Sequence, residues 1–85
     1  MAQGVYSNFE ALEGTVDGET TVSFIGNSRR ITLMNDSATK DLNFRFHDGA
    51  EAATLKATES ISLDFFSRAI IIDGDFVPYR IWVSG

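Results

Sequence analysis

Strict alternation of apolar and polar residues is the feature of this sequence that most restricts its fold. It is clearest in the run DLNFRFHDG at residues 41–49, where polar residues separate Leu42, Phe44 and Phe46. Successive side chains of a β-strand point to opposite faces, whereas one face of an α-helix recurs about every 3.6 residues. The same period of two recurs in ETTVSFIG, RRITLMN, AATLKA, SISLDF and PYRIWVSG, and RAIIID is a continuous apolar run typical of a strand buried on both faces. The chain is therefore expected to be all-β.

Turn-forming residues separate these runs. Gly, Asn and Asp cluster in GNS at residues 26–28, NDSATKD at 35–41, HDGAE at 47–51 and DGD at 73–75. Turns spaced by about 8–12 residues are typical of β-sandwiches and small barrels. The predicted fold is a small antiparallel β-sandwich or jelly-roll-like barrel of about seven strands, formed by residues 19–85. Residues 1–18 have only loose helical spacing, interrupted by Gly4 and Gly14, and are interpreted as an N-terminal arm.

Composition excludes several classes of protein. The 85 residues include no cysteine, so neither disulfides nor thiolate metal ligands can contribute to stability. A net charge of −5, with no basic cluster beyond Arg29 and Arg30, argues against nucleic-acid binding. No apolar run approaches the roughly 20 residues of a membrane span. The first ten residues lack the basic and apolar regions of a signal peptide, so we expect a protein that is made in the cytoplasm and contacts no membrane.

No set of residues predicts catalysis. His47 lies next to a carboxylate, but it is the only histidine and precedes an Asp-Gly turn signal, so a hairpin end is the preferred interpretation. The acids at residues 73–75 lack the further ligands of a calcium loop. Asn35 matches a glycosylation sequon, which is interpreted as a turn in a chain without a secretory signal. Glu59 and Asp64 could form a carboxylate pair, but so small a chain leaves little room for a sugar pocket. We expect no enzyme activity, no cofactor and no metal.

Surface aromatic residues are better candidates for function. Trp82 has the opposite parity to Tyr79, Ile81 and Val83, so it faces outward if those three face the core, unless a second layer covers it. An outward tryptophan beside Arg80 is typical of a protein interface or of a platform for sugars. The full set of candidate interface residues is Tyr6, Phe9, Leu12, Arg29, Arg30, Met34, Arg80 and Trp82.

The sequence from Arg30 onward resembles small all-β proteins and domains of tailed-bacteriophage virions. The resemblance rests on an Asn-Asp turn at residues 35–36, the strand LNFRF, the pair of strands around TLKATES and the final YRIW, and it spans about two thirds of the chain. Thr58 departs from the pattern, which has glycine between the paired strands. These motifs are strand and turn signals and include no catalytic residues.

The resemblance implies a virion structural protein that is assembled in the host cytoplasm. The first hypothesis is a capsid decoration or cement protein that docks on the major capsid protein or another virion protein. It would act as a homo-oligomer, for example a trimer, with Tyr6, Phe9 and Leu12 of the arm as apolar anchors. The alternative is a tail- or fibre-associated module that recognises a host-surface glycan through Trp82.

Overall fold

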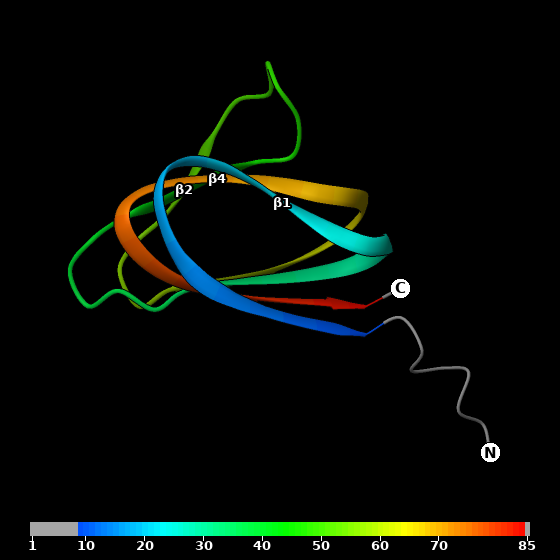
Figure 1. Ribbon diagram of the computed structural model, residues 1–85, viewed down its shortest axis with the longest axis horizontal. Helices are drawn as coiled ribbons and strands as arrows, with labels where there is room; N and C mark the ends of the chain where they lie inside the picture. Colours follow the sequence, from blue (N-terminus) through cyan, green and yellow to red (C-terminus); the bar gives the residue numbers. More distant parts are fainter. Residues whose placement is uncertain (1–8, 85) are drawn as a thin grey trace.

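The computed structural model describes residues 9–84 and places them in four β-strands. The strands are β1 (Glu10–Asn35), β2 (Leu42–Arg45), β3 (Ala53–Leu55) and β4 (Ser60–Ser84), and they pair antiparallel in the order β1-β4-β2-β3 (Figure 1). Within the described residues, no helix is long and apolar enough to cross a membrane.

The two long strands each bend and contribute to both layers of a sandwich. In the first layer, residues 77–84 of β4 pair with residues 10–16 of β1 on one side and with residues 30–35 of β1 on the other, and 30–34 also pair with 60–64. In the second layer, residues 69–74 of β4 lie between 18–23 of β1 and β2, and β2 also pairs with β3. Each layer therefore contains four antiparallel segments, which confirms the predicted all-β, jelly-roll-like sandwich.

The core lies between the two layers and is aliphatic and aromatic. Ile31, Leu33, Ile81 and Val83 of the first layer face the second, and all four are at most 2% exposed. The buried cluster is completed by Val16, Phe24, Leu42, Phe44, Leu55, Ile70, Ile72 and Val77. Phe24, Ile31, Leu33, Leu42, Phe44, Ile81 and Val83 have the parity that the alternation predicts. Ile71 is half-buried, so the predicted burial of both faces of RAIIID is only partly correct.

The predicted boundary at residue 18 is wrong for the part of the arm that the structure describes. Residues 10–16 pair with β4, and Leu12 packs against the core cluster. The sequence hides this strand because Gly14 falls at an inward position. Its missing side chain makes room for the ring of Tyr79, whose hydroxyl oxygen would lie 3.0 Å from an added Cβ. Residues 1–8, including Tyr6, lie outside the described residues.

Two of the predicted turns are bends within continuous strands. β1 continues through residues 26–28, and β4 continues through 73–75, where it passes from the second layer to the first. At this point a Cβ on Gly74 would lie only 2.7 Å from Cγ2 of Val77. The close approach of the backbone to the core therefore requires glycine. The predicted turns at residues 35–41 and 47–51 lie between strands, except that Asn35 itself is the last residue of β1.

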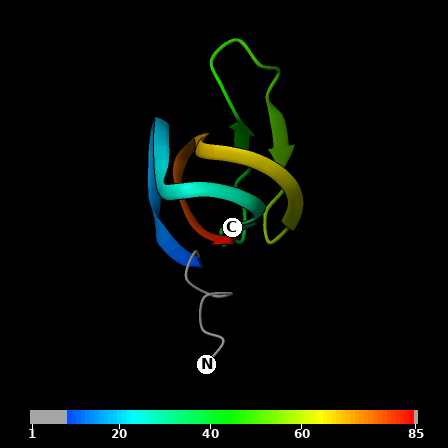
Figure 2. The same cartoon turned by 90° about the vertical axis from the view of Figure 1, so that its right-hand side faces the viewer.

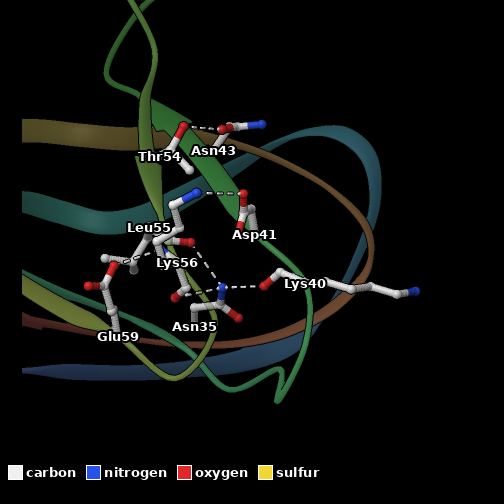
Figure 3. A network of polar contacts seen from close by, with 8 residues as sticks. All are labelled: Asn35, Lys40, Asp41, Asn43, Thr54, Leu55, Lys56 and Glu59. Atoms are coloured by element: carbon white, nitrogen blue, oxygen red, sulfur yellow. Dashed lines mark hydrogen bonds and ion pairs between the residues drawn. The ribbon is translucent and has the colours of Figure 1, made fainter.

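Asn35 connects the loop at residues 36–41 with the loop that follows β3 (Figure 3). Its side-chain amide is 2% exposed and donates to the carbonyl oxygens of Lys40, Leu55 and Lys56 at 2.8, 3.0 and 3.1 Å. Its Oδ1 accepts a hydrogen bond from the backbone of Ser37. Asn35 is the last residue of β1, and the predicted turn begins directly after it. The burial of the side chain shows in addition that Asn35 holds the loop at 36–41 against β3.

Candidate binding surface

Trp82 lies near the middle of the outer face of the first layer. Its strand neighbours Ile81 and Val83 are buried, whereas its own side chain is 45% exposed. The residues paired with it across the sheet are Ala11 and Thr32, which are too small to cover an indole ring. The ring therefore stays accessible because its cross-strand neighbours are short.

Arg80 occupies the adjacent row of the same face, between Glu13 and Met34. Its Nε and Nη2 atoms donate to the two carboxylate oxygens of Asp36 at 2.8 and 3.0 Å. These hydrogen bonds, and then the negative charge of Asp36, raise the pKa of Arg80, so its positive charge is secure. The two-point contact fixes the direction of the guanidinium, which is the geometry in which arginine pairs best with a carboxylate.

Polar pairs border Trp82 on the side away from Ala11. Thr32 and Ser62 are hydrogen-bonded through their hydroxyl oxygens at 2.9 Å. In the next row, Nε of Arg30 lies 3.0 Å from Oδ1 of Asp64. We call the set of outward residues around the indole the tryptophan face: Ala11, Glu13, Arg30, Thr32, Met34, Ser62, Asp64, Arg80 and Trp82.

The sheet thus brings together four of the eight candidate interface residues. Arg30, Met34, Arg80 and Trp82 share the tryptophan face because residues 30–34 pair directly with 80–84. The remaining described candidates lie elsewhere. Phe9 is 55% exposed just before β1, and Leu12 faces its own core, so Leu12 is not free to anchor a partner.

Arg29 lies directly after the bend of β1 at residues 26–28. Its guanidinium carbon is 5.7 Å from the centre of the Phe66 ring. Phe66 is 72% exposed and Ile25 is 89% exposed. Neither residue belongs to the candidate interface set that the sequence predicts. The pair Phe65-Phe66 was the available signal, because two consecutive strand residues cannot both face the core.

A polar hollow of about 120 Å³ on the outer face of the second layer was also missed. It is lined by Glu19, Asn43, Arg45 and Asp73, together with Phe44, Ala52 and Ile71. Arg45 forms ion pairs with Glu19 and Asp48, and the hydrogen bond that Arg45 donates to the Glu19 carboxylate is the main cause of the raised pKa of Arg45. The guanidinium of Arg45 is therefore paired with carboxylates of the protein itself.

The predicted hairpin end at His47 is an exposed turn. Nδ1 of His47 lies 2.9 Å from the carbonyl oxygen of Asp48, and Gly49 has a φ of 83°. Within residues 9–84, no three His, Asp or Glu side chains lie together in a way that could hold a metal ion. The interior of the sandwich is filled by the aliphatic and aromatic core, so the accessible chemistry lies on the outer surfaces.

Comparison with known proteins identifies the fold. No protein-family model and no curated protein sequence matches the chain. A cupin-2 domain containing protein from Shewanella frigidimarina NCIMB 400 has a similar structure, with a TM-score of 0.57, 13% identity, and coverage of 92% of this chain and 71% of that one. The coat protein of Tobacco streak virus aligns over 93% of this chain and 88% of its own, at 13% identity and a TM-score of only 0.38. At such identity the cupin-2 likeness concerns architecture alone, and the chain shares the two-layered, all-β fold of that protein.

Proposed function

We propose that this chain is a virion structural protein of a bacteriophage, most simply a capsid decoration protein that docks on the head shell through its tryptophan face. The observation that carries the proposal is the uncovered indole of Trp82 amid short neighbours, with Arg80 held in a fixed direction beside it. Tryptophan and arginine are among the residue types enriched at the energetic centre of protein interfaces.

Two further arguments support a docking role. The filled interior leaves recognition to the outer surfaces. Two of the motifs that resemble phage virion domains are strands of this sandwich. LNFRF contains β2, and YRIW is the part of β4 that carries Trp82. A homo-oligomer, such as a trimer, would multiply the contacts of a small face over several copies. The expected partner is the major capsid protein or another virion protein.

The test is the occupancy of purified heads by the full-length protein and by the variant Trp82→Ala. We expect occupancy at sub-saturating protein to fall about tenfold or more. Truncation of a tryptophan at the energetic centre of an interface costs about 2 kcal/mol or more of binding free energy. Phe76→Ala is the matched control, because Phe76 is also exposed but lies on the bend of β4. Equal occupancy by the wild type and by Trp82→Ala would contradict docking through this face.

The contribution of the N-terminal segment is tested separately by deleting residues 2–8. The deletion stops there because residues 10–16 belong to the sheet and their removal would damage the fold. If the segment contributes to docking, the deletion lowers occupancy while the melting temperature is preserved. Unchanged occupancy would limit the docking surface to the folded domain.

One observation favours a glycan as the alternative ligand. The hydroxyls of Thr32 and Ser62 follow Trp82 in the same row of the sheet, which places hydrogen-bonding groups beside a stacking surface. A glycan array probed with wild type, Trp82→Ala and Phe76→Ala examines this function. Binding that is lost only in Trp82→Ala would assign the protein to host-surface recognition, and absence of wild-type binding would remove the alternative.

A further inference from the structure

One end of the sandwich carries a second apolar surface, which borders the tryptophan face at Arg30 and Asp64. Figure 2 looks onto this end, where the bend of β1 at residues 26–28 (cyan) and the part of β4 around residues 65–67 (yellow) lie together. The two bends are joined through buried Ser28, whose Oγ donates to the carbonyl oxygen of Phe65 at 2.9 Å and accepts from the amide of Ser67 at 3.1 Å. This end is held by hydrogen bonds, so its shape is set before any partner binds.

Three apolar side chains are exposed at this end of the sandwich. Ile25 is 89% exposed, Phe66 72% and Phe65 43%. Phe65 is held in place by the ring of Phe46, at a centroid distance of 4.3 Å. Phe65 and Phe66 line one hollow, and apolar side chains that lie together on a protein surface mark interaction sites more often than single exposed residues do.

Positive charge borders this apolar surface. An open hollow of about 740 Å³ is lined by Arg29, Arg30, Asp64, Phe65 and Phe66. Asp64 neutralises Arg30 at 3.0 Å. Arg29 instead lies over the Phe66 ring at 5.7 Å, and within residues 9–84 no carboxylate forms an ion pair with it. A guanidinium that stacks on a ring through its face keeps its N–H groups directed outward, where they can bind an anion.

We propose that this end of the sandwich binds a protein segment in which a large apolar side chain is followed by a carboxylate. The apolar side chain occupies the hollow against Phe65 and Phe66, and the carboxylate pairs with the guanidinium of Arg29. Charge complementarity selects this occupant, because Arg29 beside the apolar rings forms no ion pair within residues 9–84 and can pair with a carboxylate of the partner. This inference does not depend on the function of the tryptophan face.

The test uses two short peptides as probes, acetyl-Leu-Phe-Asp-Glu-amide and its uncharged counterpart acetyl-Leu-Phe-Asn-Gln-amide. Binding to the full-length protein is followed by NMR shifts of the aromatic rings. We expect saturable shifts of the Phe65 and Phe66 rings with the acidic peptide, and binding at least about tenfold weaker with the uncharged one, because a charge-assisted hydrogen bond is lost. Equal binding of the two peptides, or none, would overturn the proposal.

Three variants assign the site. Arg29→Glu is expected to abolish the preference for the acidic peptide, and Phe66→Ser to weaken binding of both peptides. Phe76→Ser is the matched control, since Phe76 is 62% exposed on a different bend of β4. Binding that survives Arg29→Glu and Phe66→Ser would overturn the site. Both residues are exposed, so melting temperatures near that of the wild type are expected. If Phe66→Ser nevertheless unfolds, Arg29→Glu alone decides.

A second copy of the chain is the competing occupant of this end. Light scattering over a range of protein concentrations distinguishes self-association at this end from binding of a different protein. Self-association that disappears in Phe66→Ser, together with absence of peptide binding, would assign the hollow to an interface between copies and overturn the peptide partner. Binding of the acidic peptide by a protein whose oligomeric state is the same in the wild type and in Phe66→Ser supports the proposal.

Discussion

Asn35 is the single polar residue on which the ends of several segments depend. Its one amide group serves three carbonyl oxygens, and its own backbone amide donates to the carbonyl oxygen of Glu59 at 2.9 Å. Removal of the side chain would leave the buried carbonyl group of Leu55 and the part-buried carbonyl groups of Lys40 and Lys56 without this donor, and an unsatisfied buried group costs more than the net value of a hydrogen bond.

Asn35→Ala is therefore expected to lower the free energy of unfolding by about 3 kcal/mol, measured by urea denaturation. Asn43→Ala is the matched control. The amide of Asn43 forms a surface hydrogen bond with Thr54 at 2.7 Å, and its loss should cost less than about 1 kcal/mol. Similar losses in the two variants would show that burial of Asn35 adds nothing to its hydrogen bonds.

Thr58 has an unusual backbone conformation for its residue type. Its φ is 67°, in the left-handed region that glycine enters freely and that a β-branched residue avoids. The turn is held by the amide of Thr58, which donates to Ser37 at 3.0 Å, and by the amide of Glu59, which donates to Lys56. The glycine expected at this place in the phage-like pattern would thus fit the observed turn without strain.

Thr58→Gly is expected to raise the free energy of unfolding by about 0.5–1 kcal/mol, because the relief of strain exceeds the added entropy of the unfolded chain. Thermal or urea unfolding measures the change. Thr54→Gly in β3 serves as the control and should be destabilising by up to about 1 kcal/mol, since a strand position gains nothing from glycine. A loss of stability in both variants would argue against strain at Thr58.

At the scale of the element, the long strands depend on their bends. Gly74 lies where β4 passes between layers, and an added Cβ would be 2.7 Å from Val77 and 3.3 Å from Val16, both fully buried. Gly74→Ala is therefore expected to cost about 1–3 kcal/mol of stability. Gly26 lies on a bend of β1, where a Cβ would meet no atom within 4 Å, so Gly26→Ala should change stability by less than about 0.5 kcal/mol. Equal effects of the two substitutions would contradict this account of the layer crossing.

The elements also show which parts of the fold could be predicted from the sequence. Alternation gave the correct parity for Leu42, Phe44, Ile81 and Val83, because side-chain direction in a strand is a local property. The bends at residues 26–28 and 73–75 were predicted as turns between strands, since the same Gly, Asn and Asp residues permit a hairpin or a layer crossing. Only packing against distant residues, such as Val16 beside Gly74, decides between the two.

The candidate binding surface could likewise be predicted only as far as local patterns reach. The outward parity of Trp82 could be predicted from its own strand, and the parity of Arg30 and Met34 from theirs. That these strands are neighbours is a long-range pairing, between residues 30–35 and 79–84, which no local pattern encodes. The apolar end around Phe66 was hidden for a similar reason, because its bends meet through Ser28 and residues almost forty positions away.

At the scale of the whole molecule, the path of the two long strands joins the layers into one unit. β1 and β4 each contribute to both layers, and their pairing runs from Glu10–Val83 to Met34–Ser60. Neither layer can lose its sheet hydrogen bonds without freeing a strand on which the other depends. Two layers held in this way are expected to unfold together rather than one after the other.

This expectation can be tested because the only tryptophan lies in the first layer. Fluorescence of Trp82 reports that layer, and far-UV circular dichroism reports the strands of both. We expect the two urea transitions to coincide in midpoint and steepness. In the variant Phe44→Trp, Trp82→Phe the fluorescent reporter moves to the second layer, and its transition should again coincide with the circular dichroism of that variant. Midpoints that differ between probes would mean that one layer survives the loss of the other, and that the bends of β1 and β4 act as hinges between independent sheets.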